Sequence, residues 1–141
     1  MAGTFGRRAG RCPVTRVAGL AALLGGLAVA AGAFAAHGLK STLPVEALAW
    51  WKTGADYHLV HALAMLVTAL HAARFASPGR ALRVAIAAFL LGIVLFSGSL
   101  YLMALTDVRT LGAVTPFGGT AFLVGWGALA WALFRADRPQ A

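Results

Sequence analysis

Charged side chains are scarce in this 141-residue chain. Asp, Glu, Lys and Arg together make up 11% of it, against about 25% in a typical soluble domain. Hydrophobic residues make up 60%. This composition excludes an ordinary soluble globular domain and indicates a membrane protein, and the length allows one compact helical bundle rather than two domains.

The chain has a single cysteine, and the common catalytic motifs are missing. Cys12 is the only cysteine, so the chain forms no internal disulfide. No H-E-x-x-H or C-x-x-C pattern is present, and G-S-L-Y around Ser99 is not the G-x-S-x-G of a nucleophilic serine. Apart from Asp56 at the start of the second apolar segment, no acidic residue lies within these segments to orient a catalytic base. We therefore expect no enzyme activity, no catalytic residue, no metal site and no cofactor.

The charge that is present is mostly positive, with a formal net charge of +8. Such a balance can indicate nucleic acid binding. Here the basic residues lie at the ends of apolar segments, which favours a signal for membrane topology instead. We therefore expect the lipid bilayer, and no nucleic acid, among the partners.

Four apolar segments define the predicted architecture, an all-α polytopic membrane protein. Residues 84–106 contain no charge and are long enough to cross a bilayer as a helix. Residues 17–36 resemble a signal peptide, but their apolar run is longer than the usual 7–15 residues, so we expect a retained helix. The predicted domain covers residues 17–134, between a basic arm at 1–16 and a polar tail at 135–141. Its four transmembrane helices are predicted at residues 17–36, 55–73, 84–106 and 112–134.

An amphipathic stretch lies between the first two predicted spans. Pro44 suits the start of a helix, and Trp50 and Trp51 are residues typical of a membrane–water interface. We predict a short interfacial helix here, either separate or running straight into the second span.

Arginine and lysine are distributed unevenly between the two sides of this arrangement. Nine lie on the side of the termini and three on the other side, namely Lys40, Lys52 and Arg109. We expect the protein in the cell inner membrane. The positive-inside rule then predicts that both termini lie in the cytoplasm. In a eukaryote the corresponding location is the mitochondrial inner membrane, with the termini in the matrix.

Small residues recur along two of the predicted helices. They recur at spacing four in the first span and at spacing seven in the last, where small side chains allow helix backbones to approach closely. These rows predict lateral association, with other membrane proteins or in a homo-oligomer. The rows are Ala18, Ala22, Gly26 and Ala30, then Ala28, Gly32 and Ala36, and, in the last span, Gly118, Gly125 and Ala132.

Polar side chains within the spans are the candidate functional residues, because lipid offers them no hydrogen bonds. We predict that neutral His61 bonds to a hydroxyl of the third span and fixes the register of the second and third helices. A metal or haem ligand and a proton or substrate path are the alternatives. His37 is a candidate at the outer surface, and His71 is predicted to be interfacial. The candidate cluster is Tyr57, His58, His61, Ser97, Ser99 and Tyr101, the last three being the predicted partners of His61.

Four ordered motifs resemble a known family. G-A-F-A-A-H-G-L at 32–39, Y-H-L-V-H-A-L-A at 57–64, L-F-S-G-S-L-Y at 95–101 and T-P-F-G-G at 115–119 are similar to signatures of the YgdD/YwdK family. This is a family of small inner-membrane proteins with a domain of unknown function and with eukaryotic relatives resembling transmembrane protein 256. The resemblance implies a four-helix membrane protein and brings no catalytic residue with it.

Three functional hypotheses follow from these patterns. The first is a non-enzymatic accessory or structural membrane component that acts through helix–helix association. The second is a small-molecule or ion transporter or channel that uses the polar face of His61 and Tyr101. The third is a haem- or quinone-binding redox subunit.

Overall fold

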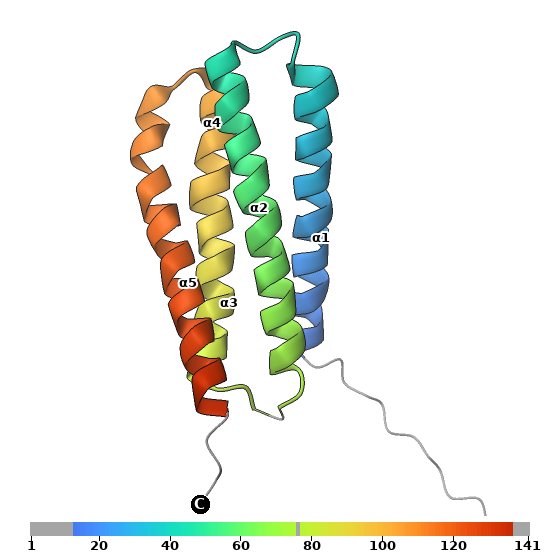
Figure 1. The fold of residues 1–141 in the computed structure, drawn as a ribbon, viewed down its shortest axis with the longest axis vertical. Coiled ribbons are helices and arrows are strands. Elements are labelled where there is room, and N and C mark those ends of the chain that lie inside the picture. The colour runs from blue at the N-terminus through green and yellow to red at the C-terminus, as the bar shows by residue number, and fades with distance from the viewer. Residues whose placement is uncertain (1–12, 76, 137–141) are drawn as a thin grey trace, which may run out of the picture.

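The computed structural model describes residues 13–75 and 77–136, and every regular element in them is helical. The all-α prediction is therefore confirmed. Short π-helical turns continue two of the helices, so that the elements form long rods that lie side by side (Figure 1). In chain order they are α1 (Pro13–Phe34), η1 (Ala35–Leu39), α2 (Val45–Ala72), α3 (Arg80–Gly92), η2 (Ile93–Ser97), α4 (Gly98–Thr106), η3 (Arg109–Ala113) and α5 (Thr115–Ala136).

The two ends of the bundle differ in what they carry. We call the end with the α1–α2 and α4–α5 connections the upper end, as it is drawn in Figure 1. The lower end carries the α2–α3 loop, the start of α1 and the end of α5 (Figure 1). Each rod therefore runs from one end of the bundle to the other.

Three segments within the described residues are long and apolar enough to cross a membrane. They are Thr15–Leu39, Arg80–Thr106 and Arg109–Arg135, and they contain the predicted first, third and fourth spans almost entirely. The helix α2 is not among them. Three histidines lower the hydropathy of this helix, and three charged residues lie in its upper half.

The predicted interfacial helix is not a separate element. Residues 45–72 form one unbroken helix of 28 residues, so the version of the prediction with a separate helix is wrong. No proline interrupts this stretch, and its one glycine, Gly54, packs against Leu100 and Tyr101. That packing keeps the middle of α2 helical where glycine alone would favour a break.

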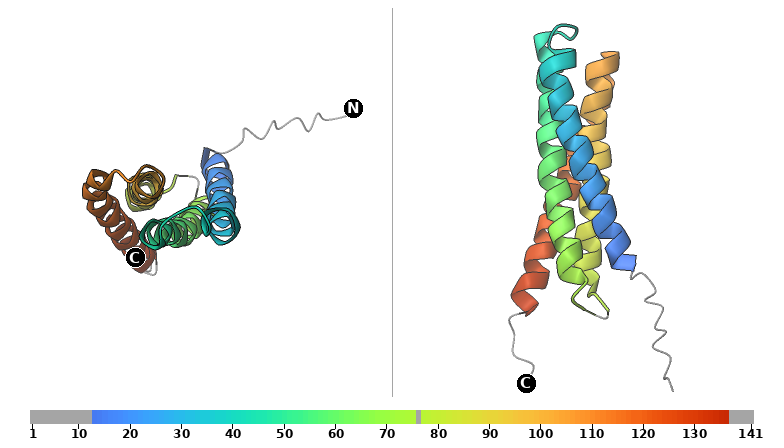
Figure 2. Two further views of the ribbon diagram at one scale, coloured as in Figure 1. Left: turned by 90° about the horizontal axis from the view of Figure 1, so that it is seen from above. Right: turned by 90° about the vertical axis from the view of Figure 1, so that its right-hand side faces the viewer.

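The rods follow one another around the bundle in an open order. The α1 rod packs along α2, α2 packs along α3, η2 and α4, and α5 packs along α3 and η2. Seen from above, α1 and α5 lie at opposite ends of the row (Figure 2). The helix α2 and the α3–α4 rod therefore lie in the middle of this row.

A repeated contact fixes the register of α3 and α5. A phenylalanine of one helix covers a glycine of the other three times in succession: Phe89 on Gly125, Phe122 on Gly92, and Phe96 on Gly118. The positions recur at spacings of three and four, as in an antiparallel coiled coil. Gly125 and Gly92 leave room for the facing rings, and Gly118 leaves room for the backbone of Phe96, so the two rods lie close together.

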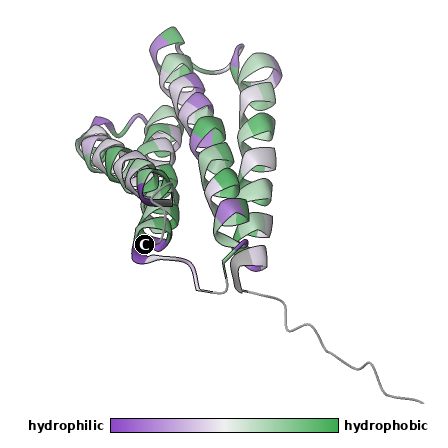
Figure 3. Cartoon of the chain, turned by 60° about the horizontal axis from the view of Figure 1, so that its bottom comes forward, coloured by the Kyte–Doolittle hydropathy of each residue, from purple (hydrophilic) through white to green (hydrophobic). Residues whose placement is uncertain are grey.

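Large apolar side chains remain exposed on every long helix, including Leu23 on α1, Val67 on α2, Leu91 on α3 and Leu123 on α5. Figure 3 shows hydrophobic residues along the rods and hydrophilic residues gathered at their ends and at points along α2. A soluble monomer rarely exposes an apolar surface this extensive. The bundle is therefore built to be surrounded by lipid.

Candidate functional site

The six polar residues of the predicted cluster come from two adjacent rods. Tyr57, His58 and His61 lie on α2, while Ser97 ends η2, and Ser99 and Tyr101 lie on α4. They do not form one network, because His58 and His61 make side-chain hydrogen bonds to different helices.

His61 is held by two hydrogen bonds and an aromatic stack. Its Nδ1 lies 2.8 Å from the backbone oxygen of Tyr57, and its Nε2 lies 3.2 Å from Nε1 of Trp126 on α5. A carbonyl only accepts and an indole N–H only donates. The network therefore assigns His61 as the neutral Nδ1–H tautomer. Its ring stacks on Phe122 with centroids 3.4 Å apart.

The prediction of the hydrogen-bond partner of His61 was wrong. His61 joins α2 to α5, not to Ser97, Ser99 or Tyr101 of the third span. Its neighbour His58 makes that contact instead, with Nδ1 of His58 3.3 Å from the hydroxyl of Tyr101. Two histidines three residues apart on α2 therefore connect it to two different helices.

The two serines have different surroundings. The Ser99 hydroxyl lies 2.9 Å from the Phe96 carbonyl oxygen and 2.8 Å from the hydroxyl of Thr115, which begins α5. Ser97 is fully buried, and within the described residues neither its hydroxyl nor Nε2 of His58 has a hydrogen-bond partner. No base lies within hydrogen-bonding distance of either described serine hydroxyl, as a serine nucleophile would require.

Tyr57 lies at the edge of the cluster. It is 45% exposed and its ring stacks on Phe96. With His61, Phe122 and Trp126 it lines a groove of about 570 Å³ between α2 and α5, and Asp56 lies at this groove too. The groove is an aromatic surface, with Asp56 contributing a carboxylate.

The other two histidines lie apart from this cluster. His37 is exposed on η1 at the upper end. His71, in the last turn of α2, packs edge-on against Phe75 at the lower end. Among the described residues, no group of three or more His, Cys, Asp or Glu side chains is placed to hold a metal ion.

Sequence reasoning missed two residues that complete these contacts, Trp126 and Thr115. The signal that could have found Trp126 is chemical. An indole N–H inside a membrane needs an acceptor, and a neutral histidine is one of the few side chains in these spans that offers one. The hydroxyl of Thr115 likewise needs a partner, and Ser99 provides it.

At the upper end, an ion pair joins the first turn of α2 to the start of η3. Nη2 of Arg109 lies 2.9 Å from Oε2 of Glu46, and the guanidinium lies 5.4 Å from the Trp50 ring centroid. Both charged side chains are more than half exposed. The pair therefore contributes less than about 1 kcal/mol to stability.

Comparison with known proteins identifies the family of this chain. A family model described as "Protein of unknown function (DUF423)" matches residues 31–119. A UPF0382 membrane protein of Haemophilus influenzae is 44% identical over 83% of this chain and 92% of its own length. The Bacillus subtilis UPF0382 membrane protein YwdK is 47% identical over 71% of this chain and 80% of its own length.

A third relative is the Escherichia coli UPF0382 inner membrane protein YgdD, 40% identical over 84% of this chain and 88% of its own length. No solved structure matches the chain at a significant level. The resemblance of the four motifs is therefore confirmed by similarity over most of the sequence. The chain belongs to the DUF423 family of UPF0382 membrane proteins.

Proposed function

We propose that this protein is a non-enzymatic component of the bacterial inner membrane that acts by associating laterally with other membrane proteins or with a second copy of itself. The observation that carries this proposal is the outer face of α1. Ala22, Gly26 and Ala30 are exposed there, and no atom lies within 4 Å of the position that a Cβ of Gly26 would occupy. Small residues at spacing four suit the close approach of another helix.

The surroundings of His61 favour association over the two alternative functions. Both of its ring nitrogens are hydrogen-bonded within the chain, and its ring face is covered by Phe122. A haem or metal ligand needs a nitrogen lone pair that is free to bind. A transport path needs polar atoms that exchange partners, whereas these are engaged in packing the helices.

We also propose that α2 crosses the membrane as a fourth span. Val60, Leu63, Val67 and Leu70 are all more than half exposed and follow one another at spacings of three and four. They form an apolar stripe on the face of α2 that points away from its neighbours. Such an apolar stripe is stable when lipid surrounds it. The charged residues of α2 lie above the stripe.

Both described ends of the chain then lie in the cytoplasm. Five arginines of the described residues lie at the lower end, which carries no acid there. The positive-inside rule assigns that end to the cytoplasm. At the upper end three basic residues are matched by three acids.

Cysteine labelling tests this topology. In a Cys12→Ser background, a membrane-impermeant maleimide added to intact spheroplasts should label Lys40→Cys and Asp107→Cys. Ser77→Cys should react only after lysis. If Lys40→Cys and Ser77→Cys react from the same side, α2 does not cross the membrane and the four-span proposal fails.

Two glycine substitutions test the association. Gly26 and Gly127 are both exposed helical glycines with no atom within 4 Å of their Cβ positions. Gly26→Leu should reduce co-purification of the partner or oligomer about tenfold, which corresponds to about 1.4 kcal/mol. Gly127→Leu is the matched control on α5 and should leave it unchanged. Equal retention in both variants, with both folded, would remove the basis of the proposal.

A further inference from the structure

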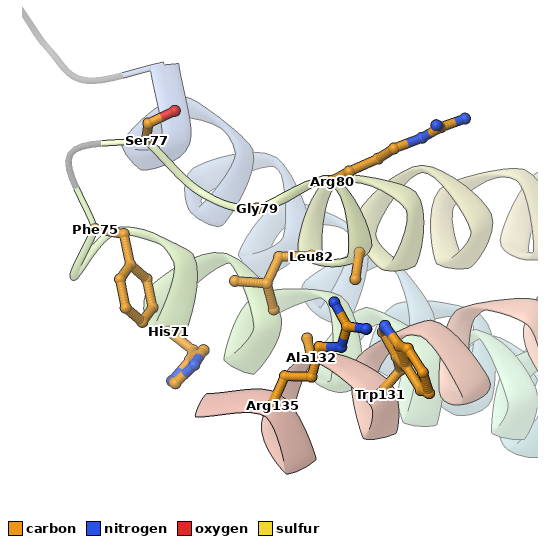
Figure 4. Close-up of a pocket in the computed structure, with 10 residues that line it drawn as sticks. His71, Phe75, Ser77, Gly79, Arg80, Leu82, Trp131, Ala132 and Arg135 are labelled. Atoms are coloured by element: carbon orange, nitrogen blue, oxygen red, sulfur yellow. The ribbon is translucent and has the colours of Figure 1, made fainter. Parts of the chain in front are cut away.

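A pocket of about 390 Å³ lies at the lower end of the bundle, away from the histidine cluster. It opens between the end of α2, the loop before α3, the first turn of α3 and the last turns of α5 (Figure 4). Its position matters because these helix ends mark one surface of the membrane. The pocket therefore lies at the depth of lipid headgroups.

Apolar side chains form the walls of this pocket. Leu82 and Ala132 line it next to the buried core, while Phe75 and Trp131 are 44% and 57% exposed. Aromatic rings at this depth are typical of a membrane interface. These walls continue into the lipid-facing surface of α5, where Phe134 is exposed as well.

The cationic group in the pocket is Arg135. Its guanidinium carbon lies 4.5 Å from the centroid of the Trp131 ring, and its side chain runs across the pocket towards that ring (Figure 4). Arg80 also lines the pocket but its side chain extends away from the others (Figure 4). Arg135 is therefore the cation that an occupant would meet.

Hydrogen-bond donors of the α3 start line the same pocket. The helix α3 starts after Gly79, which provides no side-chain cap, so the N–H groups of its first turn have no partner within the helix. Ser77 also lines the pocket, but its hydroxyl points away from Arg135 (Figure 4). A helix start with free N–H groups favours a negatively charged group, and phosphate is the usual example.

The described lower end contains no acidic residue to compete for this cation. The acids of the described residues, Glu46, Asp56 and Asp107, all belong to the upper half of the bundle. The remaining acid, Asp137, lies outside the described residues. The pocket thus combines positive charge, free donors and apolar walls at a membrane surface.

We propose that this pocket binds one anionic glycerophospholipid. Arg135 and the first turn of α3 would hold its phosphate, and Phe75, Leu82 and Trp131 would cover the start of its acyl chains. Basic pockets between membrane helices bind anionic headgroups in this way. A free phosphate would leave the apolar walls without a partner, so the occupant is a lipid. This inference is independent of the proposed lateral association.

Native mass spectrometry of the detergent-solubilised protein tests the proposal. With equal amounts of phosphatidylglycerol and phosphatidylcholine added, the protein should retain one phosphatidylglycerol in preference. Arg135→Gln should lower that preference about fivefold, the effect of one arginine near a lipid surface. Arg74→Gln is the matched control, because Arg74 is an exposed arginine at the same end that does not line the pocket.

Three results would overturn the proposal. One is equal retention of the two lipids by the unmodified protein. Another is an equal loss of preference in Arg135→Gln and Arg74→Gln, which would indicate general attraction to surface charge. The third is displacement of the bound lipid by excess glycerol phosphate alone, which would show that the apolar walls contribute nothing. Because Arg135 is exposed, its substitution leaves the helix core in place.

Discussion

Replacing Trp51 with alanine is expected to lower the free energy of unfolding by about 3–5 kcal/mol, the usual range for deleting a buried aromatic side chain. Trp51 on α2 is 8% exposed, and its indole N–H donates to the Ala31 carbonyl of α1 over 2.8 Å. Its ring also packs on Phe34 of α1 and Tyr101 of α4. The substitution removes the residue that connects three helices at the upper end.

The measurement is a denaturation series in mixed micelles, with helix content followed by circular dichroism. Trp51→Phe is the control, since it keeps a six-membered aromatic ring and loses the hydrogen bond together with the rest of the indole, at a cost of about 1–2 kcal/mol. Proteolysis should cut α1 more readily in the alanine variant. If Trp51→Ala and Trp51→Phe unfold at the same denaturant concentration, the ring does not hold α1 to α2.

Gly118→Ala should cost about 3 kcal/mol, the upper part of the range for overpacking. A methyl group at Gly118 would overlap the backbone nitrogen of Phe96 and lie 2.8 Å from its Cα. Backbone atoms cannot rotate away as a side chain can. The start of α5 must therefore move off η2, which also disturbs the bond between Ser99 and Thr115.

The adjacent glycine provides a matched control. A methyl group at Gly119 would meet only the Phe96 ring at 3.9 Å, an ordinary contact. Gly119→Ala should therefore be neutral or stabilise the helix by up to about 1 kcal/mol, because alanine is the better helix former. Both variants are compared by thermal unfolding under identical conditions. Comparable melting temperatures for the two would contradict the close approach of α5 to η2.

The long apolar segments were predictable because their length and lack of charge report directly on the membrane. That Gly118 and Gly125 share one face of α5 was predictable too, since spacing seven places them on one side of a helix. Their predicted use in lateral association was not correct, because they pack on Phe96 and Phe89 within the chain. Such patterns depend on one segment of the sequence, so they hold for any arrangement of the other helices.

The partner of His61 was not predictable in the same way. A pattern on α2 says which side chains share a face, but it does not say which helix lies opposite. That depends on the order of the rods around the bundle, and here α5 lies opposite His61 while α4 lies opposite His58. The small-residue rows of α1 show the same limit, because they indicate close packing without saying which helix lies opposite. Within the described chain α1 packs along α2 alone among the long helices.

The repeated phenylalanine-on-glycine contacts between α3 and α5 also restrict how these helices can move. Sliding by one or two residues would move the glycines away from Phe89, Phe96 and Phe122 and bring larger side chains against them. The heptad spacing repeats after seven residues, about 10.5 Å along the axis, but that shift would bring Ala132 to Phe89 and Leu129 to Gly92. That shift would break the pair of Ser99 with Thr115 and draw Arg135 towards the bilayer interior. These contacts therefore oppose sliding of α5 along its axis more than they oppose tilting of α5 away from α3.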